Sequence, residues 1–198
     1  VFGTIDLYEF SLLRGSSMLI NRRDYQYKEL SYTVRCAERN DAQAMSDLRL
    51  QLDGETENFD RAQGEGFIDR AGFEQLISND LASPKNLCLV AVVDDQLVGY
   101  SRCEGSTLIR LAHKVTFGVG VRKDFWGYGI GKALMQVSID WADANGIQKM
   151  ALEVLESNDK AVQLYQKCGF EVEGILKNDK RLSDGQYYHT ILMGRWKA

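Results

Sequence analysis

A glycine-rich segment in the second half of the chain has the residue types and spacing to bind an anion. It reads Trp126-Gly127-Tyr128-Gly129-Ile130-Gly131-Lys132 and joins an alternating apolar segment to a helical pattern. Closely spaced glycines let backbone N–H groups turn toward a ligand at a helix N-terminus, where the helix dipole adds positive potential. The segment therefore suits a pyrophosphate group, and a tight turn without a ligand is the alternative.

Two common nucleotide-binding patterns do not fit this spacing. A Walker loop needs glycine at position 126 and serine or threonine at position 133, where the chain has Trp126 and Ala133. The dinucleotide fingerprint G-x-G-x-x-G needs its third glycine three residues after the second, but Gly131 follows Gly129 by only two. The spacing therefore excludes both patterns.

Glu153 is a candidate general base. The segment Lys149–Leu155 alternates like a strand, and Glu153 shares a face with Ala151 and Leu155, so an otherwise apolar face contains one carboxylate. Burial on such a face would raise the pKa of the carboxyl group toward the range of a general base. A solvated glutamate that pairs with a neighbouring lysine is the alternative.

Tyr165 is a candidate general acid in the next predicted helix, Asn158–Cys168. Its place on one stripe with Ala161 favours a core aromatic when the residue is considered alone. A phenol can also donate a proton to a leaving thiolate. Asn158 stands where an N-cap is needed. Weaker candidates for proton transfer are Glu156, His113 and His189.

The elements that must position these residues follow from the hydrophobic periodicity. The predicted strands cover residues 32–36, 87–93, 97–103, 114–121, 149–155, 170–176 and 186–196. The predicted helices run from Asn40-Asp41 to about Leu52, from about Phe67 to just before Ser83-Pro84, from Gly129 to Asn145-Gly146, and over Asn158–Cys168. The order β-α-α-β-β-β-α-β-α-β-β indicates one α/β domain with a central mixed sheet flanked by helices. Residues 31–198 form this domain, and residues 1–30 are an N-terminal extension of unclear role.

Gly118 and Gly120 lie on one face of the predicted strand Lys114–Val121. Glycine loses side-chain packing in a strand, so the pair predicts either a bulge or a close backbone approach by a ligand.

Two ordered motifs resemble the GNAT family of N-acetyltransferases. Val121, followed after five residues by Gly127-x-Gly129-Ile130-Gly131-Lys132-Ala133-Leu134, looks like the acetyl-CoA loop of that family. The second motif consists of Leu152-Glu153-Val154, Asn158, Ala161, Leu164-Tyr165 and Gly169-Phe170. The resemblance covers about residues 32–196. Trp126 departs from it, because most members have Gln or Arg there, and the proline that often follows Val121 is missing.

The resemblance implies a fold, a co-substrate and a set of site residues. It implies that residues 31–198 form an N-acetyltransferase domain that moves an acetyl group from acetyl-CoA directly to a primary amine, without a metal. The implied acetyl-CoA contacts are Val119, Gly120, Val121, Gly127, Tyr128, Gly129, Ile130, Gly131, Lys132 and Asn158. Glu153 and Tyr165 keep the twelve-residue separation of the base and acid in ribosomal-protein N-terminal acetyltransferases of the family. A non-catalytic acyl-CoA-binding or interaction module with the same fold is the alternative.

The acceptor amine stays open at this stage. The segment Asp53–Asp80 has eight acidic and two basic residues, and a negative rim there would attract a cationic amine. A solvated helix face and loop is the alternative. The end of the chain resembles bacterial members that act on protein N-termini, polyamines and other small amines, and it does not separate them. The resemblance also allows a homodimer.

Composition excludes several partner classes. The 198 residues carry 24 basic and 28 acidic side chains, a formal charge of −4, which disfavours a general binder of nucleic acid or anionic membranes. Apolar runs are too short for a membrane span, and the N-terminus lacks the apolar core of a secretory signal. Four widely spaced cysteines and two histidines favour neither a disulfide framework nor a metal site. We therefore expect a cytoplasmic protein.

Overall fold

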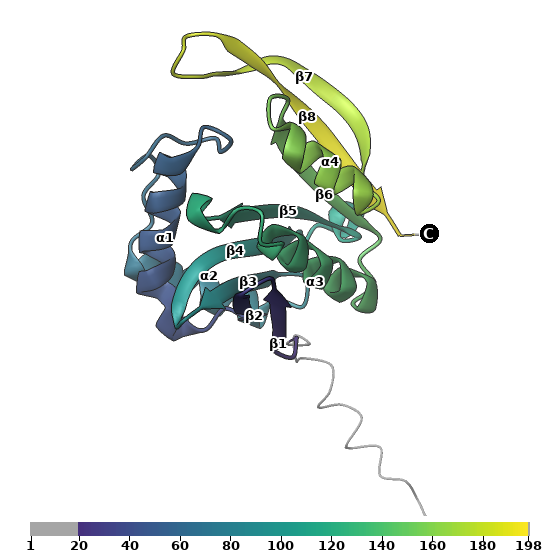
Figure 1. The fold of residues 1–198 in the computed structure, drawn as a ribbon. Helices are drawn as coiled ribbons and strands as arrows, with labels where there is room; N and C mark the ends of the chain where they lie inside the picture. The colour runs from purple at the N-terminus through teal and green to yellow at the C-terminus, as the bar shows by residue number, and fades with distance from the viewer. Residues whose placement is uncertain (1–19, 198) are drawn as a thin grey trace, which may run out of the picture.

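The computed structural model describes residues 20–197, which form a mixed sheet in the order β1-β2-β3-β4-β5-β6-β8-β7 (Figure 1). The strands are β1 Arg23–Tyr27, β2 Leu30–Cys36, β3 Leu87–Val93, β4 Gln96–Gly105, β5 Lys114–Val121, β6 Lys149–Leu155, β7 Glu171–Arg181 and β8 Tyr187–Trp196. The helices are α1 Ala42–Glu55, α2 Arg70–Ala82, α3 Ile130–Ala144 and α4 Asp159–Lys167. The predicted α/β domain around one mixed sheet is confirmed.

The helices cover both faces of the sheet. Helices α3 and α4 pack on one face around a large core, and α1 and α2 pack on the other around a smaller one (Figure 1). The predicted stripe of α3 is buried at Ile130, Leu134, Val137 and Trp141. Strand alternation sends neighbouring residues of β4 to opposite cores, since Ser101 lies 3.3 Å from Ser138 of α3 while Tyr100 packs on the α1–α2 side.

An additional strand, β1, precedes the predicted elements. It pairs with β2 as an antiparallel hairpin, and the ring of Tyr25 stacks on that of Tyr32 with centroids 5.2 Å apart. The strand lies within the segment 1–30, whose role is unclear from its residues alone, while residues 1–19 lie outside the described part. The turn residue Lys28 adopts a left-handed φ of 54°. The turn contains neither Asn-Gly nor Asp-Gly, the pairs that would predict a hairpin from the sequence.

The second helix begins later than its apolar pattern predicts. Phe67 was expected on its buried face but precedes the helix and is 57% exposed. Asp69 instead forms the N-cap, accepting a hydrogen bond from the N–H of Gly72 at 2.8 Å. The buried side of α2 rests on Phe73 and Ile77, as predicted.

The sheet opens between β5 and β6. These two strands run parallel and pair only at three positions, from Lys114↔Lys149 to Thr116↔Ala151. Within residues 20–197 no ladder pair joins the rest of β5, Phe117–Val121, to β6. The free edge of β5 therefore has backbone groups without a strand partner, beside the segment that leads into α3.

Two further features bear on partners. In the described part of the chain, no helix combines the length and apolar character needed to cross a membrane. All four cysteines are free, and Cys88 and Cys103 are buried. Burial raises the pKa of both thiols, that of Cys103 to about 12, so both side chains act as small apolar core residues.

Candidate functional site

The glycine-rich segment forms an open loop between β5 and α3. Gly127 and Gly129 have left-handed φ values of 85° and 78°, which favour glycine. A Cβ on Gly127 would meet nothing within 4 Å, and one on Gly129 would lie 3.7 Å from the hydroxyl of Tyr32. Gly131 lies in the first turn of α3. The loop therefore presents backbone, with little side-chain cover, at a helix N-terminus.

The first turn of α3 leaves its N–H groups available to a ligand. The first backbone bond of the helix runs from the N–H of Ala133 to the carbonyl of Gly129 at 2.9 Å. The N–H groups of Ile130, Gly131 and Lys132 precede that bond, and the N-cap residue Gly129 has no side chain to receive them. Tyr128 is half-buried against the core and anchors the loop.

Trp126 stabilises the loop from within. Its indole N–H donates to the carbonyl of Val121, the last residue of β5, at 2.7 Å. The N–H of Lys123, in the short 3-10 turn Lys123–Phe125, also donates to Glu55 at the end of α1, at 2.7 Å. The residue that departs from the resemblance thus ties the loop to its own strand.

The two strand glycines have different surroundings. A Cβ on Gly120 would lie 2.7 Å from Leu52 and 3.1 Å from Phe59, so contact with α1 and the following loop requires glycine there. A Cβ on Gly118 would meet nothing within 4 Å, and Gly118 lines a cavity. Of the two alternatives for this glycine pair, a bulge is excluded, because β5 pairs with β4 in continuous register. The neighbours of Gly120, Val119 and Val121, are half-buried.

Glu153 lies on the α1–α2 side of β6. Its neighbours Leu152 and Val154 belong to the core under α3 and α4, so alternation turns Glu153 to the opposite face. The expectation that Glu153 is buried is wrong: the residue is exposed. Glu153 stands two residues beyond Ala151, the last residue of β6 that pairs with β5.

Tyr165 lies on the other side of the sheet from Glu153. It is 8% exposed and belongs to the α3–α4 core, with its ring centroid 6.1 Å from that of Phe170. Burial raises the pKa of its phenol to about 12, so the hydroxyl stays protonated at neutral pH. Asn158 caps α4 as expected, its side chain accepting from the N–H of Ala161 at 3.4 Å.

The weaker candidates have structural contacts. His189 accepts a hydrogen bond from the N–H of Asn178 at 3.1 Å on Nδ1, beside an irregular stretch of the β7–β8 pair. Glu156 accepts from the N–H of His189 at 2.7 Å. The ring of His113 packs against Trp196, with centroids 6.2 Å apart.

The acidic segment Asp53–Asp80 is partly neutralised: four of its carboxylates form ion pairs, and four accept from backbone N–H groups and keep their charge. All eight carboxylates accept hydrogen bonds or form ion pairs within the protein. The donors are Arg61 for Asp53, the N–H of Lys123 for Glu55, the N–H of Ser183 for Glu57, Lys180 for Asp60, the N–H of Ala62 for Glu65, the N–H of Gly72 for Asp69, Arg70 and Arg39 for Glu74, and Arg102 for Asp80. Several donors come from distant segments, which the local charge count did not include.

A cavity of about 350 Å³ lies between the α1–α2 layer and the sheet. Its floor is the exposed face of β4 and β5, from Tyr100 and Arg102 to Gly118. The helices and their connecting loop supply the rest of the lining, with apolar residues such as Phe59 and Phe73 and the two arginines Arg49 and Arg61. The cavity thus meets β5 where its pairing with β6 ends.

The β7–β8 hairpin extends toward the loop after α1 (Figure 1). Lys180 pairs with Asp60 of that loop, and the N–H of Ser183 donates to Glu57 at 2.8 Å. These contacts tie the end of the hairpin to the loop that supplies cavity residues. Sequence analysis missed the cavity because its lining comes from five separate elements and one loop.

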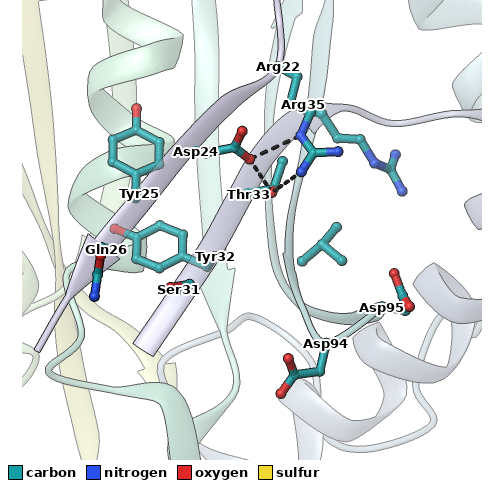
Figure 2. Close-up of a pocket in the computed structure, with 11 residues that line it drawn as sticks. Arg22, Asp24, Tyr25, Gln26, Ser31, Tyr32, Thr33, Arg35, Asp94 and Asp95 are labelled. Carbon is teal, nitrogen blue, oxygen red and sulfur yellow. Dashed lines mark hydrogen bonds and ion pairs between the residues drawn. The ribbon is translucent and has the colours of Figure 1, made fainter. Parts of the chain in front are cut away.

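A larger hollow, of about 820 Å³, lies beside the β1–β2 hairpin and the β3–β4 turn (Figure 2). There the carboxylate of Asp24 accepts from Arg22 at 3.0 Å and from Thr33 at 2.6 Å. Asp94 and Asp95 lie across from this group (Figure 2). None of the residues expected to bind acetyl-CoA or to transfer protons lines this hollow, so it is not the site in question.

Comparisons with known proteins agree with this arrangement. L-amino acid N-acetyltransferase AaaT of Escherichia coli is 30% identical over 134 residues, covering 67% of this chain and 74% of that protein. N-alpha-acetyltransferase RimI of Mycobacterium tuberculosis is 29% identical over 161 residues, covering 79% of this chain and 89% of that protein. A crystal structure of a GNAT-family acetyltransferase from Streptococcus pneumoniae matches with a TM-score of 0.81 at 25% identity, covering 84% of this chain and 99% of that one.

A sequence model of the acetyltransferase (GNAT) family matches residues 52–170, more than half of the chain. The matched region contains the glycine-rich loop, the opening between β5 and β6, Glu153 and Tyr165. The chain belongs to the GNAT family and is an acetyl-CoA-dependent N-acetyltransferase.

Proposed function

We propose that the protein transfers the acetyl group directly from acetyl-CoA to a primary amine, which a small molecule or a protein N-terminus supplies. The observation that carries the proposal is the opening between β5 and β6 beside the uncovered loop Gly127–Lys132. A linear molecule can enter such an opening, with its phosphates on the loop and its reactive end at the cavity. The names of the relatives agree with an amine acceptor, one acting on L-amino acids and one on α-amino groups.

The loop fits the diphosphate of acetyl-CoA. Its N–H groups at the start of α3 are uncovered, and the helix dipole favours a negative charge there. Lys132, in the first turn, adds a positive charge. Asn158 at the start of α4 and the free edge of Val119–Val121 would hold the pantetheine arm, which has amide groups that can pair with backbone.

Acetyl-CoA supplies a thioester, and the amine must reach its carbonyl carbon in the neutral form. A lysine-like amine with a pKa of about 10.4 is mostly protonated at neutral pH, and an α-amino group with a pKa of about 7.7–8.0 is protonated less often. Glu153, on the cavity side of the opening, accepts the amine proton directly or through a water. The N–C bond forms as the C–S bond breaks, so no enzyme-bound acetyl group is needed.

Tyr165 serves the leaving thiolate from the other side of the sheet. Its raised pKa, about 12, lies above that of an ordinary thiol, near 8.5, so full proton transfer to the thiolate is uphill. The phenol therefore acts first as a hydrogen-bond donor to the developing negative charge. Separate faces for the two tasks keep the base and the acid from neutralising each other.

The test is acetyl transfer with a panel of amines, measured as free thiol and as acetylated product by mass spectrometry. The panel contains free amino acids, their carboxamides, a polyamine and a short peptide with a free N-terminus. We expect thiol and acetylated amine in equal amounts, with little thiol released when no amine is present. Binding of acetyl-CoA without acetylation of any amine would instead support a non-catalytic acyl-CoA-binding module.

A further inference from the structure

Three arginines line the cavity between the α1–α2 layer and the sheet, and two of them are neutralised. Arg61 donates to both oxygens of Asp53, at 3.2 and 3.0 Å. Arg102 donates to both oxygens of Asp80, at 2.7 and 2.9 Å, and to Glu104 at 2.9 Å. Each of these two guanidinium groups is therefore balanced by a carboxylate beside the cavity.

The third arginine, Arg49 of α1, has no such partner. Among residues 20–197 it forms no ion pair, and its Nη1 is buried without a hydrogen-bond acceptor. A buried polar group without a partner is costly to the fold, and more so when it is charged. Such a cost at the wall of a cavity points to a ligand that completes the hydrogen bonds.

The chemistry of the missing partner follows from the guanidinium. Its planar fork of donors matches a carboxylate, which can accept two parallel hydrogen bonds. The phenol of Tyr100, on the adjacent cavity floor, offers a further donor. A cationic polyamine would instead be repelled by Arg49, and the two acids nearest the other cavity arginines, Asp53 and Asp80, are already paired.

We propose that Arg49 binds the carboxylate of a free amino acid, the acceptor whose amine then faces β5 where its pairing with β6 ends. The proposal rests on the proposed function, because it names the acceptor class of the same site. A volume of about 350 Å³ is at the lower end of the range for small-molecule sites, which suits a single amino acid. The apolar lining at Phe59 and Phe73 selects an apolar side chain such as that of leucine, methionine or phenylalanine.

The first test compares each of these amino acids with its carboxamide. The carboxamide keeps the amine and the side chain but loses the negative charge. Its amine has the lower pKa, because no neighbouring carboxylate stabilises the ammonium form, so basicity alone would favour the carboxamide. We expect kcat/KM to be higher for the amino acid by about 10- to 100-fold, the range for a lost charge-assisted hydrogen bond.

The second test removes the cation. Arg49→Gln should lower kcat/KM for the amino acids about 10- to 100-fold and change that for the carboxamides less than about twofold. Arg49→Lys, which keeps the charge without the fork, should recover part of the loss. Arg110→Gln is the matched control, since Arg110 is exposed and lies outside the cavity. Equal losses for amino acids and carboxamides, or none, would overturn the proposal.

A binding measurement keeps the proposal testable without turnover. Titration of L-leucine, L-methionine or L-phenylalanine into the protein saturated with CoA should give heat that Arg49→Gln removes and Arg110→Gln retains. Thermal unfolding supplies a second readout: Arg49→Gln should leave Tm unchanged or higher, because no internal pair is lost. Arg61→Gln should lower Tm, because it leaves Asp53 buried without its partner.

The outcomes separate the two proposals. Acetylation of polyamines, peptides or carboxamides as efficient as that of amino acids would overturn the role of Arg49 and leave the acetyltransferase function standing. Failure of every amine in the panel, with amino-acid binding that depends on Arg49, would overturn the catalytic proposal and support the site. Absence of amino-acid binding, in turn, would overturn the site whatever the turnover.

Discussion

Glu153 and Tyr165 lie on opposite sides of the sheet, and Glu153 stands on β6 just beyond the positions that pair with β5. The carboxylate is exposed on the α1–α2 side, and the phenol is buried among the residues under α3 and α4. An amine that enters from one face and a thiolate that leaves toward the other would meet the two groups in turn. The roles of these residues can therefore be tested independently.

Tyr165→Phe keeps the ring that packs near Phe170 and removes only the hydroxyl. We expect CoA affinity and Tm close to those of the wild type, while kcat falls about 10²–10⁴-fold. Because the pKa of Tyr165 is raised to about 12, the wild-type rate should show no alkaline fall from this group until the pH approaches that value. Steady-state thiol release measures both effects. An unchanged kcat would mean that Tyr165 only packs in the core and does not assist the leaving thiolate.

Glu153→Gln removes the proton acceptor and preserves the shape of the side chain. We expect a lower kcat, with a rate that follows the deprotonation of the amine itself. The loss should be recovered in part at high pH with an acceptor of low pKa, because that amine deprotonates unaided. Glu171→Gln, on the exposed strand β7, is the control. A pH–rate profile of unaltered shape would mean that water, and not Glu153, accepts the proton of the amine.

At the scale of elements, the loop before α3 depends on one side chain. Trp126→Phe removes the indole N–H that donates to Val121 and keeps an aromatic ring. We expect the Kd for CoA to rise about two- to tenfold, the value of one neutral hydrogen bond. Trp196→Phe, at an exposed position on the last strand, should leave Kd unchanged. Equal Kd values for both variants would mean that the loop holds its shape without the indole.

The start of α1, the helix that carries Arg49, depends on Asp41. Burial would raise the pKa of Asp41, but hydrogen bonds from Arg35 and from the N–H of Glu38 hold it below its usual value. A lowered folded-state pKa gives stability that is present above the unfolded-state pKa and lost as pH falls through the folded-state value.

Asp41→Asn should therefore lower the free energy of unfolding at pH 7 by about 2 kcal/mol. The difference from the wild type should shrink as pH falls below about 4. Thermal unfolding over a pH series measures it, with Asp47→Asn on the exposed side of α1 as the control. The same pH dependence for both variants would show that the Arg35 pair adds no stability.

At the scale of the whole molecule, local signals and long-range contacts differ in what a sequence reveals. Strands β3, β5 and β6 and helix α3 follow from periodicity and glycine stops, and the glycine-rich loop follows from its spacing. The exposure of Glu153 depends on which strands lie beside β6. The alternation of apolar and polar residues along β6 does not predict those neighbours. Neutralisation of part of the acidic segment depends on ion pairs such as Asp80 with Arg102, whose residues meet only in the folded chain.

The cavity is even harder to predict from the sequence, because its lining residues come from separate elements. Arg49 occupies an ordinary place in helix α1, and only the folded structure reveals that it lines a cavity and that, among the described residues, its Nη1 finds no hydrogen-bond acceptor. The sheet itself has two parts, β1–β5 and β6–β8, which share three ladder pairs. A ligand that enters between them contacts both, so CoA binding should stabilise the molecule as a whole.

The most direct test of this account is a calorimetric titration of CoA into the wild type, Gly129→Val and Gly146→Val. Both glycines have left-handed φ values, 78° and 71°, at opposite ends of α3, so each valine strains the backbone in a similar way. Circular dichroism and Tm establish that both variants fold. We predict that Gly146→Val binds CoA like the wild type, while Gly129→Val gives no binding at CoA concentrations about 100 times the wild-type Kd. Wild-type affinity in a folded Gly129→Val would contradict the assignment of acetyl-CoA to this loop.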